Sequence, residues 1–431
     1  MRRSLLKITT AVSALLLSVT APTIGEDGDI YLTAGAMVDV VAGTLVANPA
    51  LVIRDGRIAA VGIAGRLSVP DGAETIALDG MTLTPGFMDM HVHLSGDAGG
   101  NFFAGLSYSA PRQAVIAVKN ARKTLMAGFT TVRDVGAGGY SVIAVRDGIN
   151  AGDIDGPRIF AVGNAVGITG GHCDNNFMPP EMQVSSGGAA DGPWGIRAKV
   201  RENIKYGANA IKVCATGGVF SKGTKVGAQQ LSLDELKAAV AEAHQREMTI
   251  AAHAHGTDGI KAAIVAGVDS IEHASFADDE AIALAKEYGT YFSMDIYNTE
   301  YTLAFGEANG VPEENINKEK QVSAAQRAAF GNAVKAGVKM VFGSDAAIYP
   351  HGDNAKQFSR MVQFGMTPMQ ALQASTINAA TLLKMENDIG ALKEGFMADI
   401  VAVSGNPLDD ISVTENVGFV MKGGRVVKST K

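Results

Sequence analysis

The chain has 431 residues, of which 47% are hydrophobic and 51 are glycine. Its length exceeds one average domain, and its composition suits a buried parallel barrel with tight loops and a smaller satellite domain. The formal net charge of −7 gives no reason to expect nucleic acid or an anionic membrane as a partner. Neither coiled-coil heptads nor internal repeats are evident, so the sequence does not indicate a fibrous or repeat protein.

Residues 1–21 predict an export signal rather than part of the fold. Arg2 and Arg3 give a positive start, residues 8–19 form an apolar core, and Val19-Thr20-Ala21 offers a small-residue cleavage site. The apolar stretch is too short to anchor the chain in a bilayer. The two arginines also resemble a twin-arginine motif, although the usual Ser or Thr before the pair is lacking. We therefore expect a periplasmic or secreted protein without a membrane anchor in its mature form.

The two ends of the mature chain predict one small β-sandwich. Residues 22–81 contain short strand-like runs with a turn at Asp55-Gly56, and residues 386–431 contain more, with Gly423-Gly424 as a hairpin turn. Residues 82–385 lie between them and predict the main domain.

The main domain begins with a strand-like run, residues 82–89, that leads into Met90-His91-Val92-His93. Successive side chains of a strand alternate faces, so His91 and His93 point the same way and could chelate one cation. A single His-x-His pattern is weak evidence, because histidines are common on half-buried strands. The positions of the other histidines strengthen it.

Four further strand-like runs contain or end in polar side chains, at residues 208–215, 248–255, 268–273 and 338–345. The candidate ligands in these runs are Lys212, His253, His255, His273 and Asp345. Helical patterns lie between the runs, such as the one that Ser232 caps and Glu235 completes as a capping box. Strands that alternate with helices and carry polar groups at their C-terminal ends are typical of a (β/α)₈ TIM barrel.

Lys212 is the unusual member of this set. A buried ammonium costs several kcal/mol unless it is paired or neutralised. Taken alone, the residue favours an ion pair with Asp or Glu. With five other potential ligands at strand ends, we favour a carbamate formed with CO₂, whose two oxygens could bridge two cations.

This set of motifs closely resembles the amidohydrolase superfamily in its binuclear form with a carboxylated lysine. The matching motifs are His91-Val92-His93, Ile211-Lys212-Val213, His253, Ile271-Glu272-His273 and Gly343-Ser344-Asp345. Residues 51–62 and 395–403 are similar to the small β-sandwich of that family. Residues 167–172, 215–219 and 252–256 resemble the branch of Xaa-Pro and Xaa-Arg/Lys dipeptidases and ochratoxinase-like carboxypeptidases. Some dipeptidases of this branch have Tyr where this chain has His255, which puts their substrate preferences in doubt here.

The resemblance implies a binuclear metal centre with His91, His93, Lys212, His253, His273 and Asp345 as ligands. His91, His93 and Asp345 would hold the more buried cation, His253 and His273 the second, and the Lys212 carbamate would bridge them. Such ligands favour Zn²⁺, although Mn²⁺, Co²⁺ and Fe²⁺ also fit. Divalent cations lower the pKa of bound water toward about 7, so that hydroxide is available at neutral pH.

The remaining candidate roles are catalytic. The resemblance implies that Asp345 takes a proton from the attacking water and passes it to the leaving amine; the alternative is a helix cap. We expect His255 to bind the oxyanion or the substrate carboxylate, with support of a metal ligand as the alternative. His172 resembles the carbonyl-polarising histidine of the branch. His351 could line the pocket or lie on the surface, and His244 is expected to be structural.

Cys173 adjoins His172, and Cys214 follows Lys212 by two residues, so both are expected near the barrel mouth. The export signal indicates an oxidising compartment in which they could pair. We nevertheless expect two partly buried thiols rather than a disulfide or a soft metal ligand.

The sequence therefore predicts an exported hydrolase, forming a homo-oligomer, that cleaves the amide bond of a dipeptide or an N-acyl amino acid. His255, His172 and the backbone at Gly217-Gly218 are available to bind a free carboxylate on the leaving side. No obvious acidic pocket motif is present, which favours apolar leaving residues such as Phe or Pro and makes ochratoxin A a candidate substrate. A cyclic-amide hydrolase of the imidazolonepropionase kind or a deaminase is the alternative, but these usually use one metal and no carboxylated lysine. A complete ligand set also argues against a non-enzymatic binding protein.

Overall fold

The computed structural model of the chain describes residues 28–98 and 102–430, so the predicted export signal lies outside the described residues. Within these two ranges, none of the helices combines the length and the apolar character needed to cross a membrane.

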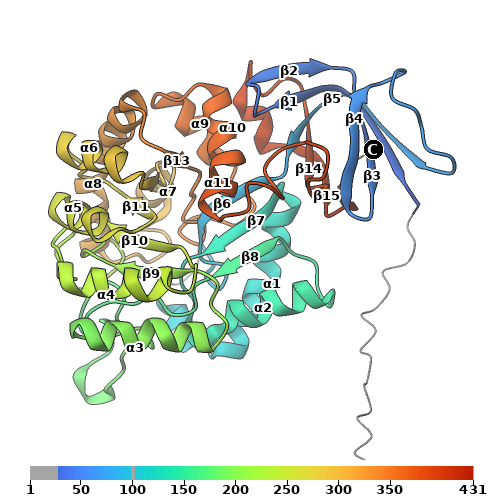
Figure 1. Ribbon diagram of the computed structural model, residues 1–431. Coiled ribbons are helices and arrows are strands. Elements are labelled where there is room, and N and C mark those ends of the chain that lie inside the picture. The colour runs from blue at the N-terminus through green and yellow to red at the C-terminus, as the bar shows by residue number, and fades with distance from the viewer. Residues whose placement is uncertain (1–27, 99–101, 431) are drawn as a thin grey trace, which may run out of the picture.

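Parallel strands form the centre of the larger part of the molecule (Figure 1). One sheet contains β6 (Phe87–Val92), β7 (Phe129–Asp134) and β8 (Arg158–Ala161), and the other contains β9 (Ile211–Cys214), β10 (Ile250–Ala254), β11 (Ser270–His273), β12 (Tyr291–Ser293) and β13 (Met340–Val341). In both sheets neighbouring strands follow one another in chain order. Isolated parallel bridges link the two sheets on both sides, Val166 to Val213 and Val92 to Ala346.

Helices connect these strands and lie on their outside (Figure 1). They are α1 (Ala110–Met126), α2 (Ser141–Ala151), α3 (Gly192–Lys205), α4 (Leu233–His244), α5 (Thr257–Ala266), α6 (Asp279–Tyr288), α7 (Asn298–Phe305), α8 (Glu313–Ala336), α9 (Lys356–Gln363), α10 (Pro368–Ala374) and α11 (Ile377–Leu382). The predicted capping box of α4 is confirmed, because Ser232 accepts the Glu235 N–H and Glu235 accepts the Ser232 N–H. This mixed α/β arrangement is consistent with a TIM-barrel-type domain.

The two-residue period of the strands decides which side chains face the interior. On β9, Ile211 and Val213 pack in the hydrophobic core, whereas Lys212 between them points to the opposite face. On β10, Ala252 and Ala254 belong to the same core, and His253 faces the interior beside β9. The apolar alternation therefore places the two polar residues on the inner side of neighbouring strands.

The remaining strands form one eight-stranded sheet from both ends of the chain. Its members are β1 (Ile30–Asp39), β2 (Thr44–Ala47), β3 (Pro49–Arg54), β4 (Arg57–Ile63), β5 (Glu74–Pro85), β14 (Ile400–Ser404), β15 (Val417–Lys422) and β16 (Arg425–Ser429). β5 pairs antiparallel with β14, which joins the two ends as expected, and it runs through the predicted boundary between residues 81 and 82. Within the described ranges all eight strands hydrogen-bond into one continuous sheet, and the small β-sandwich stays a prediction.

Candidate metal centre and active site

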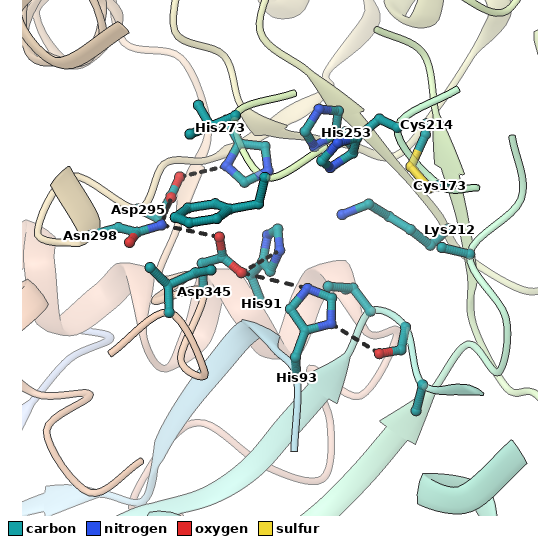
Figure 2. A pocket seen from close by; sticks show the side chains of 18 of the residues that line it. His91, His93, Cys173, Lys212, Cys214, His253, His273, Asp295, Asn298 and Asp345 are labelled. Atoms are coloured by element: carbon teal, nitrogen blue, oxygen red, sulfur yellow. Dashed lines mark hydrogen bonds and ion pairs between the residues drawn. A yellow bond between two sulfur atoms is a disulfide. The ribbon is translucent and has the colours of Figure 1, made fainter. Parts of the chain in front are cut away.

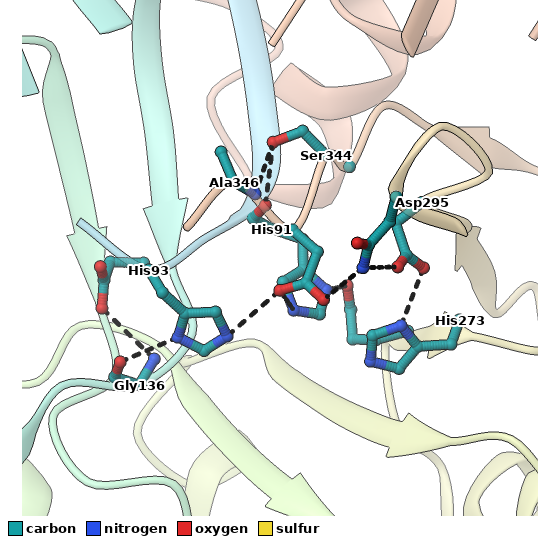
Figure 3. Close-up of polar contacts among 12 residues, drawn as sticks. His91, His93, Gly136, His273, Asp295, Ser344 and Ala346 are labelled. Atoms are coloured by element: carbon teal, nitrogen blue, oxygen red, sulfur yellow. Dashed lines mark hydrogen bonds and ion pairs between the residues drawn. The ribbon is translucent and has the colours of Figure 1, made fainter. Parts of the chain in front are cut away.

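His91, His93 and Asp345 meet where β6 ends and the chain leaves β13. His91 Nε2 lies 3.3 Å from Asp345 Oδ1, and His93 Nε2 lies 3.5 Å from the same oxygen. The turn at residues 344–346 is fastened to β6, because the Asp345 N–H donates to the His91 carbonyl at 2.8 Å and the Ser344 hydroxyl also contacts that carbonyl. Figure 3 shows this turn beside the two imidazoles. Three atoms suited to one cation are thus gathered by backbone contacts.

The opposite nitrogen of each of these rings is held by an acceptor. His91 Nδ1 lies 2.9 Å from Glu272 Oε2, and His93 Nδ1 donates to the Gly136 carbonyl at 2.9 Å. His273 Nδ1 lies 2.8 Å from Asp295 Oδ1 (Figure 3). Such contacts fix the orientation of a ring and leave its Nε2 atom to face a cation.

A second group of imidazoles lies beside the first. The ligand atoms of His253, His255 and His273 lie within 4.8 Å of one another. The ligand atoms of His91, His273 and Asp345 also lie within 4.8 Å of one another. His273 therefore belongs to both groups. His253 Nε2 is buried and has no hydrogen-bond partner in the described part of the chain. A buried nitrogen without a partner, in a cluster of rings whose other nitrogens are held, fits a metal ligand.

Lys212 is only 3% exposed, and Figure 2 shows its amine end pointing into the space between the two groups. It forms no ion pair within residues 28–98 and 102–430, which argues against the paired-lysine interpretation. Burial lowers the pKa of Lys212 to about 8, although the Glu272 carboxylate opposes this change. A lowered pKa increases the fraction of neutral amine, the form that reacts with CO₂.

Asp345 has no helix to cap, because the next helix, α9, begins only at Lys356. Its Oδ2 atom accepts a hydrogen bond from Asn298 Nδ2 at 3.1 Å. Burial raises the pKa of this carboxyl, but His91 and its hydrogen bond outweigh burial and lower it. The backbone is left-handed at Asp345, with φ of 55°, and at His273, with φ of 71°. Such strain costs about 1–3 kcal/mol per residue and clusters at functional sites. Because the next helix begins only at Lys356, the helix-cap alternative is wrong.

His172 and His255 line the same cavity as the predicted ligands. The His172 ring stacks on His253 with centroids 4.0 Å apart, and its Nδ1 atom lies 2.9 Å from Ser221 Oγ. His255 Nδ1 lies 2.7 Å from Ser275 Oγ. Burial lowers the pKa of His172 to about 3 and that of His255 well below its usual value. Both rings are therefore neutral, and His255 also lies close enough to His253 and His273 to be a ligand.

Asp295 holds a predicted ligand, a role that was not predicted for it. It follows β12 by two residues, a position similar to that of the other strand-end groups. It holds His273, and it is itself held by Asn298 at 2.9 Å and by Gln326 at 3.0 Å. Its place after a strand-like run was the signal that could have identified it.

Glu272 and Arg133 form a buried ion pair behind His91. Arg133 Nη2 lies 2.7 Å from Glu272 Oε1, and both side chains are completely buried. The guanidinium also donates to the Met90 carbonyl and to Ser270 Oγ, and the Ser270 hydroxyl donates to Glu272. Burial raises the pKa of Glu272, but Arg133 and His91 outweigh it and hold that pKa well below its usual range. The ion pair therefore positions a carboxylate against His91.

Cys173 and Cys214 form a disulfide, with Cα atoms 5.9 Å apart, so the expectation of two thiols is wrong. The bridge between Val166 and Val213 brings the loop after β8 alongside β9 and so places the two cysteines together. They are 41 residues apart in sequence, and the sequence alone did not reveal this long-range pairing. Both line the cavity.

Three smaller expectations have clear outcomes. His351 is 5% exposed and contacts the His93 carbonyl through Nε2 at 3.2 Å, so it supports the backbone of a predicted ligand. The Gly217 N–H donates to the Ala228 carbonyl at 2.8 Å and is therefore not available to bind a substrate carboxylate. His244 lies 3.0 Å from Asp269 on the outer surface, in agreement with a structural role.

The cavity above these groups has a volume of about 500 Å³. Its polar floor contains the histidines, Lys212, Asp295 and Asp345. Its walls include Tyr108, Val219, Phe220, Val322 and Ile348. All eight predicted site residues lie in this one cavity: His91, His93, His172, Lys212, His253, His255, His273 and Asp345.

Comparison with known proteins agrees with this geometry. The amidohydrolase family model matches residues 82–427. Ochratoxinase from Aspergillus niger is 34% identical over 409 residues, which cover 90% of this chain and 84% of that protein. A crystal structure of a Xaa-Pro dipeptidase with bound methionine in the active site is 38% identical, with a TM-score of 0.87 over 93% of this chain and 100% of that chain. The crystal structure of A. niger ochratoxinase is 32% identical, with a TM-score of 0.82 over 93% of this chain and 96% of that chain. The chain belongs to the amidohydrolase family, in the branch that contains these dipeptidases and ochratoxinase.

Proposed function

We propose that the chain is an exported hydrolase with two divalent cations, built on a (β/α)₈ barrel, that cleaves the amide bond of a dipeptide or an N-acyl amino acid. The observation that carries this proposal is the single cavity in which Lys212 points between the two imidazole groups (Figure 2). A lysine in that position also argues against the alternative of a one-metal cyclic-amide hydrolase or deaminase. The disulfide supports export, because such bonds persist in oxidising compartments.

The donor set fits two cations. His91, His93 and Asp345 would hold one, and His253 and His273 the other, with a Lys212 carbamate between them. Imidazole and carboxylate ligands suit Zn²⁺. When bound, the cations acidify water and polarise the substrate carbonyl.

The chain's own residues supply the remaining chemistry. Asp345 presents one oxygen to His91 and His93 and the other to Asn298, so its carboxylate is fixed where it can accept a proton from water and return it to the leaving amine. If His172 Nδ1 accepts the Ser221 hydroxyl, then its Nε2–H can donate to the substrate carbonyl. His255, held in the same way by Ser275, can donate to the oxyanion or to the substrate carboxylate.

The cavity walls indicate the leaving residue. Tyr108, Phe220 and Ile348 provide aromatic and aliphatic surface beside the polar floor. We therefore propose an apolar or aromatic C-terminal residue such as Phe or Pro. Ochratoxin A, an amide of phenylalanine, is a candidate because ochratoxinase is among the similar proteins.

The test compares an N-acyl-phenylalanine with its C-terminal amide as substrates of the metal-loaded protein. We expect the free acid to have the higher kcat/KM, because a neutral amide loses charge-assisted hydrogen bonds to the carboxylate. Equal kcat/KM values for the two substrates would contradict the carboxypeptidase-like assignment.

A further inference from the structure

Glu319 is a buried carboxylate in the cavity wall that the proposed chemistry does not use. It lies on α8 with Val322 and Gln326, three and seven residues further on, and all three line the cavity. This spacing places them on one face of the helix. Glu319 is 4% exposed, so its side chain is directed inward rather than toward solvent.

Contacts on both sides of Glu319 fix α8 in this position. Before it, Lys318 Nζ donates to the Ser221 carbonyl at 2.7 Å and Asn315 donates to the Val219 carbonyl. After it, Gln326 donates to Asp295 at 3.0 Å. The helix therefore spans from the loop after β9 to the group that holds His273. Glu319 is presented by a fixed element between these two anchors.

The Glu319 carboxylate has little compensation for its burial. The Thr299 hydroxyl donates to Oε1 at 2.5 Å, and in the described part of the chain Oε2 has no partner. Burial raises the pKa of Glu319 to about 7, although the Thr299 hydroxyl and Arg327 oppose this change and Asp295 and Asp345 add to it. Arg327 forms no ion pair with Glu319 within the described ranges.

Two other buried carboxylates of the chain have more hydrogen-bond partners than Glu319. Glu272 has the Arg133 guanidinium, the Ser270 hydroxyl and the His91 ring as partners. Asp89 accepts the Ser344 N–H and the Asn354 amide, together with the His91 N–H. A buried carboxylate without such donors costs free energy unless a partner arrives. For a residue that lines a substrate cavity, that partner can come from the substrate.

We propose that Glu319 binds a protonated nitrogen of the substrate. This inference rests on the proposed function and narrows it, because an N-acyl amino acid with an apolar leaving residue has no such nitrogen. Two parts of a peptide substrate can supply one: the α-ammonium of the first residue, or the side chain of a basic leaving residue. The apolar walls favour the α-ammonium, so an unblocked dipeptide is the expected substrate.

The experiment compares the metal-loaded wild-type protein with Glu319→Gln on three substrates: alanyl-phenylalanine, acetyl-alanyl-phenylalanine and acetyl-alanyl-lysine. The glutamine keeps the acceptor for Thr299 and removes only the charge. We expect kcat/KM for alanyl-phenylalanine to fall by roughly 10- to 100-fold, the loss of one hydrogen bond to a charged group. The value for acetyl-alanyl-phenylalanine should stay within about twofold. Glu313→Gln, an exposed change of the same charge on the same helix, is the matched control.

Each outcome decides the inference. A selective loss on alanyl-phenylalanine assigns the α-ammonium, and a selective loss on acetyl-alanyl-lysine assigns the basic leaving residue. An equal change on all three substrates shows a structural role and overturns the inference. If the wild-type protein hydrolyses none of the three substrates, the proposed function fails. Calorimetric binding of alanyl-phenylalanine then tests the inference separately. Weaker binding to Glu319→Gln than to the wild type supports the inference, whereas equal or undetectable binding overturns it.

Discussion

The two halves of the cavity floor hold their imidazoles by different means. The first half consists of His91, His93 and Asp345, and the second of His172, His253 and His255. In the first half the Nδ1 atoms face a carboxylate or a backbone carbonyl, and a further carboxylate lies among the rings. In the second half the held Nδ1 atoms face serine hydroxyls, and His253 Nε2 has no partner in the described chain.

This difference changes the charge that each half offers to a cation. Burial and Lys212 lower the pKa of His91, but Asp345 and Glu272 outweigh them and raise it to about 9. The second half contains neutral imidazoles only, because burial and the neighbouring rings lower the pKa of all three. The first half contains the Asp345 carboxylate and has the Glu272 carboxylate behind His91, whereas the second half has no carboxylate of its own. Its neighbour His273 is held by Asp295, and the proposed Lys212 carbamate would lie between the two halves. We infer that, in the proposed binuclear centre, the first half would bind its cation more strongly.

The largest effect is expected from Lys212→Ala, which removes the lysine proposed to carry the bridging carbamate. Wild-type protein should contain about two divalent ions per chain, and the variant should lose most of them, the ion of the second half first. Metal analysis of the purified proteins measures this, with bicarbonate during expression expected to raise the metal content of the wild type only. Unchanged metal content in Lys212→Ala would remove the binuclear model.

Asp345→Asn should separate proton transfer from metal binding. The amide cannot carry the proton, so kcat should fall by roughly 10²- to 10⁴-fold or more. Because His91 and His93 remain, at least one cation should stay bound. The measurement is kcat together with metal content, and near-normal turnover in a metal-replete variant would show that another group moves the proton.

The sequence was sufficient to predict which polar residues gather in the cavity, because the position of each follows from local rules. A two-residue period and a position at the end of a strand select His91, Lys212 and His253, and these rules need no knowledge of distant contacts. The capping box at Ser232 is local in the same sense. Residues that satisfy such rules were placed in the cavity as expected.

The missed features depend on contacts between distant segments. The Cys173–Cys214 disulfide needs the loop after β8 to lie beside β9. Glu319 lies on α8, and only the packing of this helix over the cavity brings its side chain inward. Sequence periodicity identifies which face of an element is buried but not what lies against it.

The smallest effects on metal binding are expected from changes to the groups that hold the imidazole rings, a carboxylate in one case and a hydroxyl in the other. Asp295→Asn removes the carboxylate that holds His273, and Ser275→Ala removes the hydroxyl that holds His255. Loss of a carboxylate behind a ligating histidine should weaken metal binding by roughly 10- to 100-fold. Loss of a neutral hydrogen bond should weaken it by only about 2- to 10-fold. Competition with a chelator measures both.

The control for Asp295→Asn is Asp234→Asn, the same change at an exposed position in the first turn of α4, which should leave metal binding unchanged. Thermal unfolding of the metal-free variants checks that each remains folded, since Asp295 also accepts hydrogen bonds from Asn298 and Gln326. If Ser275→Ala weakens binding as much as Asp295→Asn does, then His255 is itself a strong ligand. His253, His255 and His273 would then hold the second cation, and its dependence on the proposed Lys212 carbamate would be correspondingly smaller.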